Sequence, residues 1–356
     1  MPWQRLGHRL GFAQIHSLDL MTRLAPALLV SALLTACANS RTPSMAPQPI
    51  LSCRTASVQW LGPDDRSDRK RLDAWCAGVG PVIVAAGAIG APREISPRDI
   101  TFVSWNVHVG NGDIARFVND LREGRLTDGR RPADIVLLLQ EAVRLGDVPA
   151  LPPDASGARR ISVKHPPATD IREVGRALDM WLVYAPSMRN GNRADDPPED
   201  RGNAILSTLP LSDARAVELP GERQRRVALF ARLATGSSDR VSAGVIHFDA
   251  LAAPKQLWVF GTSTVRALQA RSLSTVAPEG TLVLGADLNT WHGADEPAPK
   301  ILGQLFAGTP VTADRSAPSH RVLDYMFFRA EGATARYRVV GDQYGSDHHP
   351  LIGWLQ

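Results

Sequence analysis

The sequence predicts an α+β fold in which mixed β-sheets are covered by helices. Short apolar runs recur along the chain and alternate with segments of helical periodicity. Most runs are joined by hairpin-length links and only a few have a helix between them, which disfavours a doubly wound parallel sheet. With 356 residues, 44% of them hydrophobic and 21% charged, the chain is long enough for one large core or two modest ones.

The first expected strand is the run TFVSWNV at 101–107, which is rich in β-branched and aromatic residues. Gly-Asn-Gly then turns the chain, and Asp113 is placed to cap a helix. Apolar residues follow at helical spacing, at Ile114, Phe117, Val118 and Leu121. Further strands are expected at 133–142, 180–185, 203–208, 227–233, 241–248, 281–291, 321–328 and 335–341, and a second helix at 262–276.

The overall charge gives no reason to expect a general field that attracts nucleic acid. The formal net charge is +4, but residues 1–36 contribute three Arg against one Asp. The remaining chain has 37 Lys and Arg against 35 Asp and Glu. A body so close to neutral binds a polyanion only through a local basic patch.

The N-terminus has the pattern of a bacterial secretion signal. After Met21, which we expect to be the true start, one Arg precedes an apolar stretch of about 13 residues, too short to span a bilayer. The stretch ends in Leu-Thr-Ala-Cys at 34–37, which resembles a bacterial lipobox. We therefore expect Cys37 to carry lipid and to become the first mature residue. The alternative is an ordinary signal peptide cut near Ala36.

This interpretation divides the chain into four parts. Residues 1–36 form the signal peptide, and residues 37–50 form the lipidated Cys and a polar, Pro-rich flexible tether. Residues 51–98, here called the preface, carry no pattern to which the sequence assigns a role. Residues 99–356 form the main domain. We expect a lipid-anchored protein of the cell envelope, on the outer membrane of a Gram-negative bacterium.

The chain has three cysteines. If Cys37 carries lipid, Cys53 and Cys76 remain as a pair in an oxidising compartment. They either form a disulfide, which closes a loop of about 20 residues worth on the order of 3 kcal/mol, or stay as two buried thiols. We expect the disulfide.

Acids, amides and imidazoles mark the ends of several apolar strands. The residues are Asn106, Glu141, His247, Asp287 with Asn289, Asp324 within a late strand, and Asp347 with His348 near the end of the chain. Burying such groups singly costs several kcal/mol each, whereas gathered at one end of a sheet they can satisfy one another around a hard cation. Carboxylates and amides suit Mg²⁺ or Mn²⁺.

The same positions carry a resemblance to a known family. In order along the chain, the motifs are SWN (104–106), LLQE (138–141), IHFD (246–249), LGADLNT (284–290), LDYMF (323–327) and SDHHP (346–350). Together they resemble the endonuclease/exonuclease/phosphatase superfamily of metal-dependent phosphoesterases. The resemblance implies a four-layer α/β/β/α sandwich of two packed mixed sheets, with the site at one end. GNAILST (202–208) is similar to the family's central strand, and it implies Asn203 as a substrate-binding residue.

The resemblance also implies a role for each strand-end residue. Glu141 is the principal metal ligand, with Asn106 and Asp347 as further metal-site residues. Asp324 orients His348, which lies over the scissile phosphate. Asp287 and Asn289 position the attacking water and the phosphate, and His247 binds a phosphate oxygen. We favour Asp287 as general base and cationic His348 as stabiliser, although the opposite assignment stays open. His349 takes the variable place of the motif and is expected at the surface or in packing.

These residues predict an extracytoplasmic, Mg²⁺- or Mn²⁺-dependent phosphodiesterase, most simply one that acts on nucleic acid. Arg226 lies in a basic segment, GERQRRVALF (221–230), which either holds substrate phosphates or is a solvated hairpin edge. One alternative substrate is a phospholipid head group, as in the sphingomyelinase-like branch. An alternative of another class is a non-catalytic binding lipoprotein on the same fold. The expected partners are the phosphodiester and the membrane, and no obligate protein partner is evident.

Overall fold

The computed structural model describes residues 42–88, 93–149, 168–190, 197–221, 223–236, 240–250, 258–306 and 322–356. The predicted signal peptide and Cys37 lie outside these residues, so their assignment stays a prediction. Within the described residues, no helix combines the length and the apolar character needed to cross a membrane.

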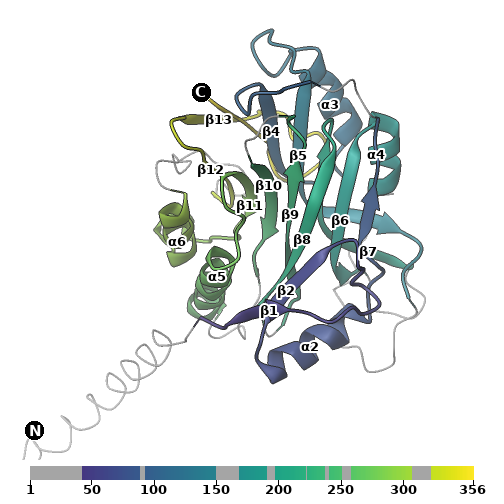
Figure 1. Ribbon diagram of the computed structural model, residues 1–356, viewed down its shortest axis with the longest axis vertical. Helices are drawn as coiled ribbons and strands as arrows, with labels where there is room; N and C mark the ends of the chain where they lie inside the picture. Colours follow the sequence, from purple (N-terminus) through teal and green to yellow (C-terminus); the bar gives the residue numbers. More distant parts are fainter. Residues whose placement is uncertain are drawn as a thin grey trace, which may run out of the picture. The chain divides into compact units, whose positions relative to one another are not determined.

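Two seven-stranded mixed sheets form the centre of the fold (Figure 1). The first, sheet A, has the order β1-β2-β8-β9-β10-β11-β12. Its strands are β1 (Met45–Pro47), β2 (Gln59–Pro63), β8 (Leu211–Leu219), β9 (Arg226–Leu233), β10 (Val241–His247), β11 (Thr281–Asp287) and β12 (Asp324–Arg329). Neighbours in sheet A are antiparallel except for the parallel pairs β2–β8 and β10–β11.

The second sheet, sheet B, has the order β13-β14-β4-β5-β7-β6-β3. Its strands are β3 (Ile83–Ala85), β4 (Ile100–Asn106), β5 (Asp134–Leu145), β6 (Trp181–Arg189), β7 (Glu199–Ser207), β13 (Ala335–Val339) and β14 (Leu351–Leu355). Only β4 and β5 are parallel. The predicted mixed sheets are confirmed.

Helices cover the outer face of each sheet, which gives four layers. Sheet B packs against α3 (Ile114–Arg122) and α4 (Ile171–Leu178), and sheet A packs against α5 (Trp258–Ser274) and α6 (Pro297–Leu305). Figure 1 shows the two helix pairs on opposite sides of the sheets. A third apolar cluster lies between the sheets and is built almost entirely from strand residues. The predicted α/β/β/α sandwich is therefore correct.

The helix predicted after Asp113 forms for the expected reasons. The Asp113 carboxylate accepts a hydrogen bond from the Arg116 N–H at 2.9 Å, which satisfies one of the free donors at the helix start. Ile114, Phe117 and other apolar residues of α3 are buried against sheet B. This packing fixes the segment that follows Asn106 and so helps to shape one wall of the site.

The preface is part of the fold. Strand β2 extends sheet A beside β8, while β3 adds an edge strand to sheet B beside β6. Helix α2 (Arg66–Cys76) lies between them in sequence and is capped by Asp65, and a disulfide joins Cys53 to Cys76. The preface thus contributes to both sheets.

The expected tether is shorter than 37–50. Within its described part, Met45–Pro47 forms β1 and pairs with β2 in an antiparallel register. Pro-rich composition favoured a flexible segment, but edge strands accept Pro because one side of the strand needs no ladder hydrogen bond. From Met45 onward the segment therefore belongs to sheet A.

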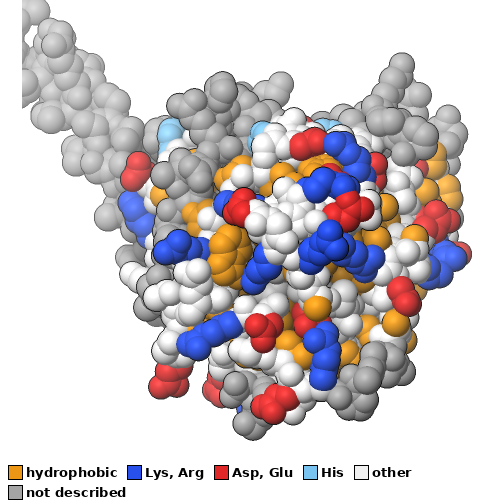
Figure 2. Space-filling view, turned by 90° about the horizontal axis from the view of Figure 1, so that it is seen from above, with side chains coloured by type: hydrophobic (Ala, Val, Ile, Leu, Met, Phe, Trp, Pro, Cys, Tyr) orange, Lys and Arg blue, Asp and Glu red, His pale blue; other side chains and the backbone are white. Residues whose placement is uncertain are grey.

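Charge on one end of the molecule is mixed in sign. Figure 2, which looks down from the top of Figure 1, shows Lys and Arg side chains interspersed with Asp and Glu side chains. Such a surface attracts no polyanion as a whole, in agreement with the nearly neutral composition.

Candidate active site

Three neighbouring strands place three of the predicted residues in one row. His247 at the end of β10 is the register partner of Asp287 at the end of β11, and Asp287 is in turn the partner of Asp324 at the start of β12. The distance between His247 Nε2 and Asp287 Oδ2 is 3.5 Å. All three side chains are at least nine-tenths buried. The strand-end pattern in the sequence therefore marks a real cluster at one edge of sheet A.

Sheet B reaches this row through Asn106 at the end of β4. The Asn106 Nδ2 group donates a hydrogen bond to Asp287 Oδ2 at 2.8 Å, which links the two sheets. Two residues before Asp287, a Cβ on Gly285 would lie 2.7 Å from Ser104 Oγ and 2.8 Å from Leu138 Cβ. The glycine in LGADLNT thus allows the sheets to approach closely enough for this contact.

Glu141 lies at an irregularity of β5. The pairing of β5 with β7 shifts between Leu139 and Ala142, and Glu141 has a left-handed backbone with φ 57°. A β-bulge re-aims a side chain in this way. The Glu141 carboxylate lines the groove described below, where its Oε2 lies 3.2 Å from Arg201 Nη1.

His348 is held by Asp324. The distance between His348 Nδ1 and Asp324 Oδ2 is 2.8 Å. Burial alone lowers the pKa of His348, but the charge and hydrogen bond of Asp324, with the charges of Asp287 and Asp347, raise it from 6.5 to about 10. The imidazole is therefore a cation at neutral pH, with Nδ1 engaged by Asp324 and Nε2 on the groove side, 3.8 Å from Asp347 Oδ1.

The pKa of Asp287 is raised toward neutral pH, which suits a general base. Burial, followed by repulsion from Asp324, raises the pKa of Asp287 from 3.8 to about 6. Its Oδ1 accepts a hydrogen bond from the Asn289 N–H at 2.9 Å, and Asn289 Nδ2 donates to the Phe248 carbonyl at 3.1 Å. Asn289 therefore lies beside Asp287, as the sequence predicts, and its side-chain amide is bonded to the residue that follows β10.

Asp347 pairs with a residue that the sequence analysis did not single out. The distance between Asp347 Oδ1 and His108 Nδ1 is 2.5 Å. This hydrogen bond raises the pKa of His108. Burial alone raises the pKa of Asp347, but the bond from His108 and the charge of His348 outweigh it and lower that pKa. His108 stands two residues after Asn106. This closeness in sequence to a predicted site residue is the signal by which His108 could have been predicted.

One groove collects most of the predicted residues. Its volume is 260 Å³. The lining residues are Asn106, His108, Val109, Glu141, Arg201, Arg226, His247, Ala250, Asp287, Asn289, Asp347 and His348. Asp324 stands behind His348 as its hydrogen-bond partner.

Two arginines give this groove a positive wall. Arg201 and Arg226 are 3% and 2% exposed. Three of their buried N–H groups, at Arg201 Nε and Nη2 and at Arg226 Nε, have no hydrogen-bond partner among the described residues. Burial lowers the pKa of Arg226, and the charge of Arg201 adds to this lowering. The charges of nearby carboxylates act in the opposite direction but do not outweigh it. Buried cationic donors without partners indicate a place for an anion.

Arg201 was missed by the sequence analysis, although it directly precedes the GNAILST segment. Arg226 belongs to the groove, which favours the phosphate-binding interpretation of its segment over the solvated edge. Asn203 is not among the lining residues, and its Nδ2 donates to the Val227 carbonyl at 2.7 Å. This contact joins β7 to β9, so a substrate-binding role for Asn203 has no support here. His349 Nδ1 donates to the Val340 carbonyl at 2.8 Å, outside the groove.

Backbone strain is concentrated at the groove. Nine non-glycine residues in the described part have positive φ, and His108, Val109, Glu141 and Asn289 among them line the groove. The φ of Val109 is 54°, a costly conformation for a β-branched residue. Such strain persists only where the surroundings hold it, and it clusters at functional sites.

The donor set fits a hard divalent cation. Glu141, Asn106 and Asp347 line the groove and carry side-chain oxygen atoms, and oxygen ligands suit Mg²⁺ or Mn²⁺. A tighter group is formed by Asp287, Asp324 and His348, whose ligand atoms lie within 4.8 Å of one another. Because His348 is cationic and bonded to Asp324, that group is better suited to proton handling than to holding metal. The oxygen donors on the Glu141 side are the better cation ligands.

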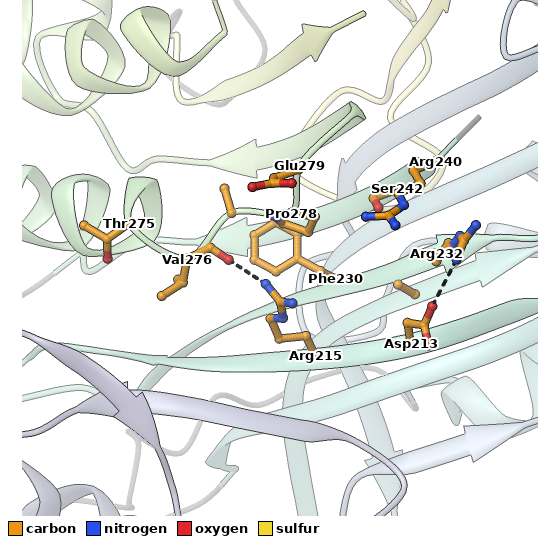
Figure 3. A pocket seen from close by; sticks show the side chains of 12 residues that line it. Asp213, Arg215, Phe230, Arg232, Arg240, Ser242, Thr275, Val276, Pro278 and Glu279 are labelled. Atoms are coloured by element: carbon orange, nitrogen blue, oxygen red, sulfur yellow. Dashed lines mark hydrogen bonds and ion pairs between the residues drawn. The ribbon is translucent and has the colours of Figure 1, made fainter. Parts of the chain in front are cut away.

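A second, larger groove lies elsewhere on sheet A and has a different character (Figure 3). Its volume is 530 Å³. Arg215 donates to the Val276 carbonyl at 2.9 Å, and Arg232 lies 3.6 Å from Asp213. None of the predicted site residues lines it.

Comparison with known proteins agrees with this geometry. The model of the endonuclease/exonuclease/phosphatase family matches residues 103–348. No curated protein matches the chain. Among solved structures, an endonuclease/exonuclease/phosphatase from Beutenbergia cavernae is 17% identical, with 72% of this chain and 71% of that chain covered and a TM-score of 0.49.

Two further solved structures are similar at the same level. A family protein from Leptotrichia buccalis is 12% identical, with coverage of 72% and 99% and a TM-score of 0.48. The human Nocturnin catalytic domain with bound sulfate anion is 14% identical, with coverage of 72% and 93% and a TM-score of 0.46. With a family match that spans more than half of its length, the chain belongs to the endonuclease/exonuclease/phosphatase family and is a hydrolase of phosphoric esters.

Proposed function

We propose that this protein is a Mg²⁺- or Mn²⁺-dependent phosphodiesterase that cleaves nucleic acid outside the cytoplasm. One observation carries the proposal. Two buried arginines line the groove that also holds the carboxylates and a cationic imidazole, and some of their N–H groups have no partner within the part of the chain that the structure describes. A phosphodiester carries one negative charge and several oxygen atoms that accept hydrogen bonds. It can therefore supply the hydrogen-bond acceptors that these arginine N–H groups need.

The chain's own residues divide the chemistry between them. Arg201, Arg226 and His247 bind phosphate oxygens and fix the diester in the groove. Asp287, with its raised pKa, accepts a proton from the attacking water. His348⁺ donates from Nε2 to the oxygen on which negative charge develops, and Asp324 keeps the imidazole in that orientation. A cation held by Glu141, Asn106 and Asp347 would supply positive charge that polarises the P–O bond.

The lining of the groove favours a substrate that is recognised mainly through its phosphate. Val109 and Ala250 are the apolar members of the described lining, and no Phe, Tyr or Trp belongs to it. A lipid head group with its acyl chains would call for more apolar surface. Sequence is read through contacts to base edges, whereas contacts to phosphate and sugar carry no sequence information. Nucleic acid cut without strong sequence preference fits this lining best.

The location follows from the N-terminal sequence. The segment Leu-Thr-Ala-Cys at 34–37 supports lipid attachment at Cys37 and an anchor on the outer membrane. Palmitate labelling of the wild type in cells, lost in Cys37→Ser, is the expected result. Labelling that persists in the variant would remove the anchor from the proposal and leave the chemistry untouched.

A substrate panel tests the function directly. The soluble 38–356 protein is incubated with Mg²⁺ and plasmid DNA, RNA, sphingomyelin, phosphatidylinositol or bis-p-nitrophenyl phosphate. We expect cleavage of DNA or RNA and of the small diester, and none by Asp287→Asn. Cleavage of a lipid alone would replace nucleic acid with a phospholipid. Absence of any hydrolysis, with inorganic phosphate still bound, would identify a non-catalytic binding protein.

A further inference from the structure

The two site arginines make few hydrogen bonds within the described part of the chain. Among the described residues, Arg201 contacts Glu141 at 3.2 Å and Arg226 Nη2 donates to Gln224 Oε1 at 3.0 Å. Each side chain keeps buried N–H groups without partners. Their placement therefore depends on how the backbone at the start of β7 and β9 is held.

The residue before Arg201 is anchored to the preface. Asp200 is fully buried, and its carboxylate accepts hydrogen bonds from the Gly80 N–H and the Tyr184 hydroxyl, both at 2.8 Å. It also pairs with Arg144, which donates to the Pro81 carbonyl at 2.6 Å. Because successive side chains of a strand point to opposite faces, Asp200 turns away from the groove that Arg201 lines.

Glycine is the only residue type that fits at position 80, where the preface contacts Asp200. A Cβ on Gly80 would lie 2.6 Å from the Asp147 carbonyl oxygen and closer still to the Arg144 guanidinium. The preface backbone thus enters the Asp200 network directly.

The residue before Arg226 is anchored in the same way. Arg225 is fully buried and makes two bonds to the Glu218 carboxylate, at 2.7 and 3.0 Å. Arg54 of the preface binds the same carboxylate at 2.8 Å. Burial alone raises the pKa of Glu218, but the charges of Arg225 and Arg54 outweigh it and hold that pKa below its usual value. The preface supplies half of the charge that keeps this buried carboxylate ionised.

The two anchors belong to one cross-linked unit. Cys53 precedes Arg54, and its disulfide partner Cys76 lies four residues before Gly80. The Val82 N–H donates to the Cys53 carbonyl at 3.1 Å, and Arg225 Nη2 lies 3.2 Å from Cys53 Sγ. One piece of the preface, the loop closed by the Cys53–Cys76 disulfide and the residues that directly follow it, therefore touches the residues directly before both site arginines.

We propose that residues 53–82 act as a clamp that positions Arg201 and Arg226 for phosphate binding. Arg54, Glu218 and Asp200 are positioning residues, since they touch no substrate and act through their neighbours. This inference rests on the proposed function and extends it by giving the preface a role in substrate affinity.

Calorimetric titration with inorganic phosphate in the presence of Mg²⁺ tests the clamp without need of turnover. Arg226→Met should lose most of the phosphate affinity of the wild type. Arg54→Met and Asp200→Asn should each raise the Kd about tenfold, which corresponds to ~1.4 kcal/mol. Arg54→Lys keeps the charge beside Glu218 but not the forked contact, and should fall between the wild type and Arg54→Met.

A matched control separates positioning from general loss of stability. Val136 is fully buried between the sheets, near the start of β5 and away from Glu141. Val136→Ala leaves a cavity, so it should lower the Tm and leave the phosphate Kd unchanged, with all titrations run below every variant's transition. An equal loss of affinity in Val136→Ala and Arg54→Met would overturn the clamp.

The remaining outcomes separate this inference from the proposed function. Wild-type affinity in Arg54→Met and Asp200→Asn, with affinity lost in Arg226→Met, would refute the clamp alone. No phosphate binding by the wild type, or undiminished binding by Arg226→Met, would refute the phosphate site itself and the clamp with it.

Discussion

At the scale of single residues, the site depends on charges that are costly alone and stable together. Asp287 and Asp324 are buried side by side, and His348⁺ offsets their repulsion. The sequence predicted these members because Asp287 ends an apolar strand, Asp324 interrupts a late one, and His348 belongs to the SDHHP motif that follows. It did not predict Arg201 or His108, because neither stands at a strand end in the predicted pattern. Their ion pairs with Glu141 and Asp347 became visible only when the fold brought distant segments together.

The pH dependence of hydrolysis follows from two of these residues. Asp287 acts as a base only when ionised, so kcat/KM should rise as pH increases through about 6. His348 stabilises charge only when protonated, so the rate should fall as pH passes about 10. A pH profile of bis-p-nitrophenyl phosphate hydrolysis should be bell-shaped. In Asp324→Asn the alkaline limb should move to lower pH, because the main charge that raises the pKa of His348 is gone. An alkaline limb unmoved in that variant would argue against the His348 assignment.

Arg201 should affect metal and substrate in opposite directions. Its guanidinium lies beside Glu141 and repels a cation there, so Arg201→Met should tighten Mg²⁺ binding in the absence of substrate. The same change removes hydrogen bonds to the phosphate, and KM should rise roughly tenfold or more. Titration calorimetry with Mg²⁺ and steady-state kinetics measure the two effects. A KM equal to that of the wild type would exclude Arg201 from phosphate binding.

At the scale of helices and strands, the patterns with strong local causes were predicted best. The strand ending at Asn106 and the helix capped by Asp113 form close to their expected bounds. β8, β14, α4 and α6 were not recognised, and neither were the elements of the preface. β3 is a short edge strand beside β6, and β2 joins the edge strand β1 to β8, so each preface strand has a partner that is distant in sequence. Local composition carries little information about such pairing, since edge strands draw their stability from the sheet that they join.

The disulfide should be a main source of stability for the preface. It closes a loop between residues 23 apart in sequence, and a cross-link of this length stabilises by roughly 3 kcal/mol. The double variant Cys53→Ser/Cys76→Ser should therefore unfold at a lower urea concentration than the oxidised wild type. The wild type treated with reductant during unfolding should approach the variant. Identical midpoints for oxidised wild type and variant would show that the bond contributes nothing to folding.

At the scale of the whole molecule, two sheets meet at one end and assemble a site that neither holds alone. Asn106 and Glu141 come from sheet B, while His247, Asp287 and Asp324 come from sheet A. The inter-sheet bond from Asn106 to Asp287 joins the two halves. The four-layer arrangement was predictable because the motif order resembles a known family. The charge pairing inside the groove was not, since it depends on distances set by the packing of the sheets.

The most direct measurement is hydrolysis of bis-p-nitrophenyl phosphate by protein stripped with EDTA and then supplied with Mg²⁺ or Mn²⁺. For the wild type, we predict that activity disappears on chelation and returns with either cation. Glu141→Gln, folded as judged by circular dichroism, should stay inactive at every cation concentration at which the wild type is saturated. Hydrolysis that continues at the same rate in the presence of EDTA, or full activity in Glu141→Gln, would contradict the claim that a cation and a phosphodiester bind together in this groove.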